Sequence, residues 1–280
     1  MSRQMKSRLF VGAMFLSLAV SFGTLAWLLI TTLIDGVPGL SMQLFTAPPS
    51  TVPEEAGARP AILATIYLAV LLLVFTVPIG VGTAVYLEEY ARKERWYNRF
   101  LELNIQNLAA VPAIVYGILG LAYIVRGPFG VGRVLLAGAL ILTLVVLPTV
   151  IIASREAIRA VPDSISQGGL ALGATKWQVI WRQVLPASIP GIATGSILAL
   201  SRAVGETAPL LLIGALQYVA FDPTILGAFT ALPVQIYTWV KLPGPEFQTL
   251  AAAAIIVLLV IVLAMNALAI FVRNRYRQTW

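Results

Sequence analysis

The 280-residue sequence contains no cysteine and no histidine, and only 12 of its residues are acidic. These absences exclude disulfide bonds, thiolate nucleophiles, histidine general bases and zinc sites built from Cys and His. Any metal site would have to be built from the few carboxylates. A membrane-embedded enzyme is therefore disfavoured, because the chain has few side chains suited to metal or nucleophilic chemistry.

Charge is also scarce. Charged residues make up 11% of the chain and hydrophobic residues 59%, and the mean hydropathy is +0.89. A soluble domain is typically about 45–50% apolar and about 25% charged. With so few charges, a water-exposed surface would carry very large apolar patches. The composition therefore predicts a membrane protein.

Long apolar runs recur along the chain at or near the roughly 20 residues that a helix needs to cross the hydrocarbon core. No strand-like alternation competes with them, so we expect an all-α polytopic fold with about six transmembrane helices. The first run is too long for the core of a signal peptide and predicts a retained anchor. The predicted spans are Leu9–Ile34, Ala61–Leu87, Asn104–Val125, Val134–Ala153 (the shortest), Ile189–Leu216 and Leu250–Val272.

The placement of Lys and Arg predicts the orientation. Fourteen basic residues fall in the two termini and the even-numbered loops, whereas four fall in the opposite set. The positive-inside rule places the larger set, and therefore both termini, in the cytoplasm. The net charge of +7 then reflects topology, and no nucleic-acid partner is expected. The larger set is Arg3, Lys6, Arg8, Arg92, Lys93, Arg95, Arg99, Arg155, Arg159, Lys176, Arg182, Arg273, Arg275 and Arg277, and the smaller is Arg59, Arg126, Arg133 and Lys241.

The sequence predicts an N-terminal anchor helix with an external loop at residues 1–60, followed by a transmembrane core at residues 61–280. Residues 35–60 are rich in proline and predict an irregular loop. Residues 217–249 are rich in proline and aromatic residues and too interrupted to span, so an interfacial or re-entrant helix is expected there.

The fourth loop, Ser154–Ser188, is long and has the pattern of a folded segment. Asp163 or Ser164 is suited to begin a helix, and Gly173 to end one. Four apolar residues then recur at helical spacing and predict a second, amphipathic helix. Such a helix-turn-helix beside the membrane needs a surface to pack against. The four residues are Trp177, Ile180, Trp181 and Val184.

Arg202 and Glu206 stand in the middle of the fifth predicted span. A charge at the bilayer centre costs about 2.5–3.5 kcal/mol on insertion scales, so the two charges require an explanation. Their i, i+4 spacing places them on one helix face, close enough to pair. Gly205 leaves room beside them, and Pro209 is expected to free the carbonyl of Gly205 and bend the helix.

Two interpretations of this pair remain. It is either a buried ion pair that fixes packing against a neighbouring subunit, or the lining of a substrate path, which we favour. A guanidinium binds phosphate oxygens in bidentate fashion. Glu206 would orient Arg202, weaken its hold on a bound anion, or accept a proton from that anion. Ser201, Thr207 and Tyr116 offer hydroxyls, although hydroxyls in spans more often bond to helix backbone.

Other polar and aromatic residues have plainer interpretations. Glu88 and Glu89 predict a solvated cytoplasmic turn. Trp177 and Trp181 are either headgroup anchors or contacts to a partner protein. The basic residues of the C-terminal tail predict lipid contact.

The fourth loop resembles the E-A-A-x3-G-x9-I-x-L-P signature of bacterial ABC importer permeases, with Gly173, Leu185 and Pro186 at the signature positions. It departs from the signature at residues 167–169, where Gln-Gly-Gly replaces E-A-A, and at Gln183, where Ile is usual. Three further stretches resemble phosphate importer permeases, and more closely the PstA-type subunit than its PstC-type partner. They are residues 107–117, 201–211 and 232–237.

This resemblance implies the type I ABC importer permease fold and a permease subunit of an ATP-driven phosphate importer in the bacterial inner membrane. The implied partners are a PstC-type permease, a dimeric ATP-binding subunit and an extracytoplasmic phosphate-binding protein. The ATPase would dock on the fourth loop, about residues 154–188. The residues implied to serve this docking are Gly173, Ala174, Thr175, Lys176, Trp177, Leu185 and Pro186.

The chain has no G-x-x-x-x-G-K-[ST] motif, so it is not expected to bind ATP in a P-loop. ATP and Mg²⁺ would be used by the partner ATPase, and no cofactor or metal is expected on this chain. A permease for sulfate, molybdate or phosphonate is the nearest alternative. A stand-alone secondary anion transporter is a further one, although the sequence lacks the inverted repeats typical of that class.

Overall fold

The computed structural model describes residues 3–92, 94–216 and 218–275, and within these ranges it contains helices and turns without a β-strand. The predicted all-α class is therefore confirmed. Five helices in the described ranges are long and apolar enough to cross a membrane, and a sixth crossing results if one bent pair counts as a single span. Lys93 and Arg277, which contribute to the predicted orientation, lie outside the described residues.

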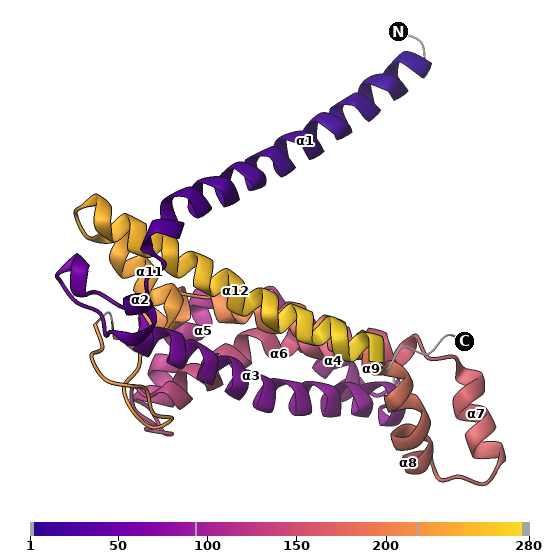
Figure 1. Ribbon diagram of the computed structural model, residues 1–280. Coiled ribbons are helices and arrows are strands. Elements are labelled where there is room, and N and C mark those ends of the chain that lie inside the picture. The colour runs from indigo at the N-terminus through magenta and orange to yellow at the C-terminus, as the bar shows by residue number, and fades with distance from the viewer. Residues whose placement is uncertain (1–2, 93, 217, 276–280) are drawn as a thin grey trace.

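The first helix, α1 (Arg3–Gly36), stands apart from the other helices (Figure 1). None of its most apolar 18-residue window is buried within the chain. It meets the bundle only near its C-terminal end, where Gly36 lies against the backbone of Ala252. The chain then passes through two 3-10 turns, η1 (Val37–Gly39) and η2 (Pro53–Glu55), and a short helix, α2 (Met42–Thr46).

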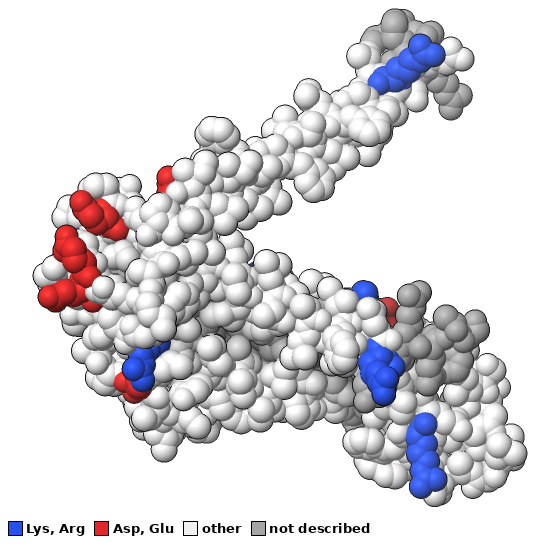
Figure 2. All heavy atoms as spheres, viewed as in Figure 1, with Lys and Arg blue, Asp and Glu red and all other residues white. Residues whose placement is uncertain are grey.

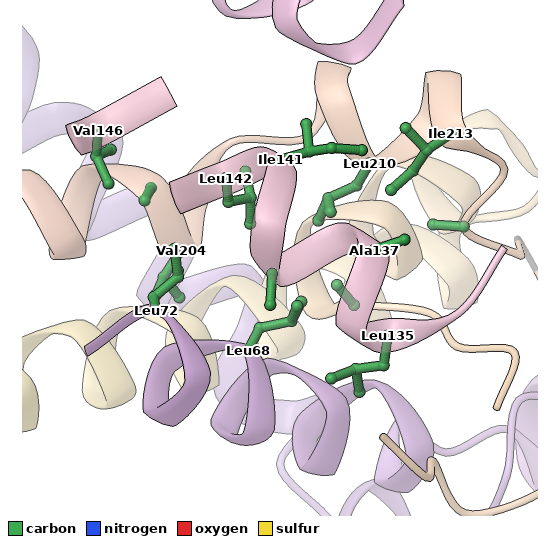
Figure 3. Packing of buried hydrophobic residues seen from close by; sticks show 14 of the residues in the cluster. Leu68, Leu72, Leu135, Ala137, Ile141, Leu142, Val146, Val204, Leu210 and Ile213 are labelled. Atoms are coloured by element: carbon green, nitrogen blue, oxygen red, sulfur yellow. The ribbon is translucent and has the colours of Figure 1, made fainter. Parts of the chain in front are cut away.

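Four long helices form the bundle: α3 (Arg59–Val85), α6 (Leu135–Arg159), α9 (Leu185–Gly205) and α12 (Pro245–Arg275). The core is centred on α6, whose most apolar window is 61% buried, more than that of any other described span. The fourth predicted span ends too early, because α6 runs on to Arg159, but at 25 residues it is, as predicted, the shortest of the five described helices that could cross a membrane. Side chains from α3, α6, α9 and α10 meet in this core (Figure 3), among them Leu68, Leu72, Ile141, Leu142, Val204 and Leu210.

Small residues bring α6 and α9 into close contact. Gly191 and Gly195, one helical turn apart, lie against Ala157 and Ala153. A Cβ on Gly191 would lie 2.6 Å from the Cβ of Ala157, and one on Gly195 would be closer still to that of Ala153. Close backbone approach through small residues is the usual basis of helix packing in lipid, where apolar burial gives little drive for association.

We expect Gly195→Ala to lower the free energy of unfolding by about 1–3 kcal/mol, the usual range for overpacking. Gly82→Ala is the matched control, because apart from its chain neighbours and the backbone of its own helix no atom lies within 4 Å of a Cβ at Gly82. There the higher helix propensity of alanine should raise stability by up to about 1 kcal/mol. Chemical unfolding in detergent micelles measures both changes. Equal effects of the two substitutions would contradict the packing argument.

The third predicted span, Asn104–Val125, is not a continuous helix. Helix α4 (Trp96–Ala109) is followed by α5 (Ala113–Gly120) and a π-helical turn, η4 (Leu121–Val125). The two parts are bent by 103°. The bend lies at Pro112, which lacks an amide hydrogen and disfavours the helical conformation in the residue before it.

The fifth predicted span, Ile189–Leu216, is wrong at both ends. Its helix begins upstream and continues as α9 to Gly205, where it stops. A short helix, α10 (Ala208–Ile213), follows the break. The segment that was predicted to contain a helix too short to span contains α11 (Leu232–Lys241), which confirms that helix.

The two ends of the bundle differ in charge (Figure 2). Acidic side chains gather mostly at the end where α2 and the turn between α11 and α12 lie, whereas basic side chains gather at the opposite end and at the free tip of α1. The exposed acidic residues include Glu54, Glu55 and Glu246. We call these the acidic end and the basic end.

Candidate translocation site and helical hairpin

The Arg202–Glu206 pair forms as predicted, with Arg202 Nε 3.4 Å from Glu206 Oε1. The Arg202 side chain is 76% exposed and that of Glu206 is 23% exposed. The chain itself therefore leaves most of the guanidinium uncovered. A charge in this position must face water or another chain, because exposure to lipid would be unfavourable.

The pair lies at the end of a helix rather than in the middle of one, which corrects the prediction. Glu206 is already extended, with φ −73° and ψ 112°. Pro209 cannot donate a hydrogen bond to the carbonyl of Gly205, and glycine is itself a poor helix former, so the helix ends here instead of bending. Arg202 thus stands in the last turn of α9, where the C-terminal carbonyls favour a cation.

Ser201 and Thr207, two of the three residues predicted to offer hydroxyls, are placed differently. The hydroxyl of Ser201 donates to Asn266 Oδ1 of α12 at 2.7 Å, so it ties α9 to α12 and does not face Arg202. Thr207 lies in the break between α9 and α10, where its carbonyl accepts the amide of Leu211 at 3.0 Å. The structure therefore brings together Arg202 and Glu206, with Thr207 next along the chain and Ser201 directed away.

The bent helix α4–α5 packs beside this break. A Cβ on Gly117 of α5 would lie 2.8 Å from Pro209 Cα of α10, so the two backbones are in close contact. Across the bend, the hydroxyl of Tyr116 donates to the carbonyl of Leu108 at 2.9 Å. This confirms the plainer interpretation of Tyr116, whose hydroxyl satisfies a backbone group and holds the bent shape.

The fourth loop folds as the predicted helix-turn-helix. Helix α7 (Asp163–Ala171) is joined to α8 (Lys176–Val179) by a turn in which Gly173 has φ +82°, a conformation that favours glycine. Asp163 is in the first turn of α7 and does not cap it with its side chain. Thr175 caps α8 in a reciprocal arrangement with Gln178. We call residues 163–179 the α7–α8 hairpin.

The chain is not interrupted at Leu185 and Pro186, the closing positions of the loop signature. Helix α8 continues through a π-helical turn, η5 (Ile180–Val184), into α9, so residues 176–205 form one helical span of 30 residues. The amide of Leu185 donates to the carbonyl of Ile180, five residues earlier. This wider turn accommodates Pro186, which has no amide hydrogen to donate.

Apolar side chains of the hairpin and of the adjoining turn η5 remain uncovered. Leu172 beside the turn is 90% exposed, and Trp177 and Trp181 are 58% and 54% exposed. The two indole rings lie 5.2 Å apart, edge to face, and line a cavity of about 480 Å³ against α3. Ile180 and Val184, the other two residues of the predicted apolar face, are buried. The hairpin thus packs on the bundle with one face and presents another outward.

A buried charge cluster at the basic end was not predicted from the sequence. Glu88 lies in a π-helical turn after α3, η3 (Tyr86–Tyr90), and its side chain is 7% exposed. Arg155 Nε lies 2.7 Å and Arg159 Nη2 2.8 Å from Glu88 Oε1. Arg155 Nη2 also lies 2.8 Å from Glu102 Oε1 of α4. The prediction of a solvated turn is therefore wrong for Glu88.

One sequence signal pointed to this cluster. Arg155 and Arg159 share a face at the end of a long apolar run, and Glu88 directly follows another such run. Charges at the same membrane boundary on neighbouring helices are able to pair. The spacing of residues along the sequence, however, does not show which helices are neighbours in the fold.

Residues 76–278 match the family described as "Binding-protein-dependent transport system inner membrane component". The chain is 33% identical to the phosphate transport system permease protein PstA of Yersinia pestis, over 98% of this chain and 92% of that protein. It is also 33% identical to PstA 1 of Mycobacterium tuberculosis (strain H37Rv), over 97% and 88%. A "Probable ABC transporter permease protein YqgI" of Bacillus subtilis is 31% identical, over 96% and 95%.

Solved structures share the fold. One is a bacterial alginate ABC transporter in complex with an alginate-bound periplasmic protein, with a TM-score of 0.69 at 19% identity over 99% of this chain and 98% of that one. Another is the MetNI methionine ABC transporter in an inward-facing conformation, with a TM-score of 0.60 at 17% identity over 78% and 94%. At these identities the likeness establishes the architecture of an ABC importer permease.

Proposed function

Because the chain belongs to the family of binding-protein-dependent transport system inner membrane components, we propose that this multi-pass permease subunit passes inorganic phosphate across the membrane. The chain would form half of the translocation path and receive its energy from a separate ATPase. The relatives named as phosphate permeases, matched over nearly the full chain, support phosphate over other oxyanions.

The observation that carries the proposal is the exposed guanidinium of Arg202 at the interrupted end of α9. Glu206 contacts Nε, so the edge formed by Nη1 and Nη2 is the one that would meet the oxygens of an anion. This edge matches phosphate in bidentate geometry. The carboxylate of Glu206, whose side chain is largely covered, would limit how tightly the anion is held, and it offers an acceptor for the proton of hydrogen phosphate, which sulfate lacks.

The α7–α8 hairpin is the proposed docking surface for the ATPase. Its uncovered residues Leu172 and Trp177 provide an apolar patch that a partner would bury. ATP and Mg²⁺ would be bound by that partner. A phosphate-binding protein would deliver the anion at the acidic end, and a second, PstC-type permease would complete the path beside Arg202.

The separation of charge along the bundle supports the proposed orientation. Arg159, Lys176 and Arg182 lie at the basic end with the hairpin, and this end would face the cytoplasm under the positive-inside rule. Both termini would then be cytoplasmic.

Uptake of labelled phosphate into vesicles tests the function. With the companion subunits reconstituted, we expect uptake that requires ATP and the binding protein, and that excess sulfate does not reduce. Inhibition by sulfate, molybdate or phosphonate would indicate a permease for that anion. Uptake by this chain alone, without ATP, would indicate a secondary transporter and contradict the proposal.

A further inference from the structure

The buried ion pair between Glu88 and Arg155 lies at the basic end of the bundle, where η3, α6 and α4 meet. Both side chains are less than one-tenth exposed, at 7% and 8%. Buried charges are weak evidence for added stability, because desolvation offsets much of their attraction. Their positions therefore call for an explanation beyond holding the bundle together.

Arg155 uses separate atoms to hold two different elements. Its Nε contacts Glu88 of η3 at 2.7 Å, and its Nη2 contacts Glu102 of α4 at 2.8 Å. Helix α4 packs against α6, but Asn98 is its only buried residue. The amide of Asn98 donates to the carbonyl of Arg92 at 2.9 Å, and its Oδ1 accepts a longer hydrogen bond, of 3.5 Å, from the hydroxyl of Tyr86 in η3. Among the described residues, the 2.8 Å contact between Arg155 and Glu102 is therefore the shortest side-chain tie between α4 and the bundle.

The α7–α8 hairpin is attached to the same π-helical turn. Lys176 donates to the carbonyl of Glu89, lies 3.7 Å from its carboxylate, and stands 5.1 Å above the ring of Tyr90. An apolar cluster that includes Ala84, Ile158 and Val179 packs the hairpin against α3 and α6 at the basic end of the bundle. Movement of the hairpin must therefore pass to η3.

Two connections lead from this end of the molecule to the candidate translocation site. One is covalent, since α8 continues into α9 and ends beside Arg202. The other passes from η3 to α4, which are consecutive in the chain and are held together through Arg155, then around the 103° bend to α5 and from Gly117 onto α10 directly after the break at Glu206. The two connections reach opposite sides of the break.

We propose that Glu88 and Arg155 are positioning residues that make α4–α5 move together with the α7–α8 hairpin, so that both sides of the break at Glu206 respond to the ATPase. The inference rests on the proposed docking role of the hairpin and not on the identity of the transported anion. Without the pair, the hairpin and α9 would still move, whereas α4 and α5 would not follow.

The absence of cysteine allows spin labels to be introduced without background. One label pair joins exposed Ser164 of α7 to exposed Leu263 of α12, and the other joins exposed Ile118 of α5 to Leu263. In the reconstituted complex, distances are measured by pulsed electron resonance with and without a non-hydrolysable ATP analogue. In the unsubstituted complex we expect both distances to change on nucleotide binding.

In Glu88→Gln and Arg155→Met we expect the Ser164–Leu263 change to persist and the Ile118–Leu263 change to be lost. Arg155→Lys should restore little, because one ammonium cannot reproduce the fixed fork that holds Glu88 and Glu102. Glu156→Gln is the matched control: this carboxylate contacts Arg159 at 3.3 Å and is 65% exposed, so both changes should remain.

A single substitution that leaves a buried charge unpaired is able to prevent folding. The double variant Glu88→Leu/Arg155→Met removes both charges and keeps the volume apolar, a replacement that buried ion pairs often tolerate. In it, ATP hydrolysis per complex should persist while anion uptake per ATP falls. A retained Ile118–Leu263 change in this folded variant would overturn the inference, and so would hydrolysis and uptake that decline in proportion.

The distance measurements do not depend on which anion is carried. Failure of phosphate uptake in the unsubstituted complex would therefore contradict the proposed substrate and leave the inference standing. A hairpin distance that does not respond to nucleotide in the unsubstituted complex would contradict the docking role itself.

Discussion

Replacing Arg202 with alanine is expected to reduce ATP-driven phosphate uptake about 10- to 100-fold, since hydrogen bonds to charged groups contribute about 1.5–3 kcal/mol and each 1.4 kcal/mol is a tenfold change. The Arg202 side chain is 76% exposed, and within the described residues its guanidinium forms an ion pair with Glu206 through Nε. Lysine would retain the charge without the planar, bidentate geometry, so Arg202→Lys should also be strongly impaired. Initial uptake rates in vesicles, normalised to the amount of assembled complex, measure the effect.

Arg126→Ala is the control for this experiment. It removes one positive charge from an exposed arginine in the turn after η4, and we expect uptake close to that of the unsubstituted protein. If Arg202→Ala left phosphate uptake intact with normal expression, Arg202 would be a packing residue and the proposed translocation site would be wrong.

The second large effect is expected at the tip of the α7–α8 hairpin. Leu172→Asp should weaken ATPase binding about 10- to 100-fold, because burying a leucine contributes about 1.5–3 kcal/mol. A carboxylate in its place would also have to be desolvated. Leu172 is 90% exposed, so the substitution leaves the core of the permease unchanged. Co-purification and a titration of the purified ATPase into detergent-solubilised permease measure the loss.

Leu172→Met keeps an apolar side chain of similar volume and should bind the ATPase nearly as well as the unsubstituted protein. Normal ATPase affinity of a folded Leu172→Asp protein would show that the partner does not bury this residue. The proposed docking surface would then have to exclude the hairpin tip.

The sequence was sufficient for features that depend on local chemistry. Composition and run length predicted an all-α membrane fold, and the spacing of Arg202 and Glu206 predicted their contact. The turn at Gly173 and the two helices around it followed from residues that favour helix ends and one apolar face. The contact and the turn depend on neighbours within a few positions along the chain, and the fold class depends on composition and run length alone.

What the sequence did not reveal depends on competition between local signals or on tertiary neighbours. The hydropathy of an apolar run does not reveal a break in the helix. The segments on either side of Pro112, and those on either side of the break before Pro209, were therefore each predicted as one continuous span. The opposite error was made at Leu185–Pro186. These residues were expected to close the fourth loop, whereas the helix continues through them because a π-helical turn accommodates the missing hydrogen bond. Glu88 resembled a solvated residue because its partner Arg155 is distant in sequence.

The helical run of α8, η5 and α9 is continuous, with the hairpin at one end and the candidate anion ligand at the other, and it changes direction between α8 and α9 (Figure 1). With a rise of 1.5 Å per residue, Arg202 lies about 26 Å along α9 from Leu185. A rotation of α9 by about 6° around its first turn would displace Arg202 by about 3 Å, roughly the length of one hydrogen bond. A small tilt imposed at the hairpin would thus be enough to exchange one set of oxygen contacts at Arg202 for another. The ATPase would therefore need to move the hairpin only slightly.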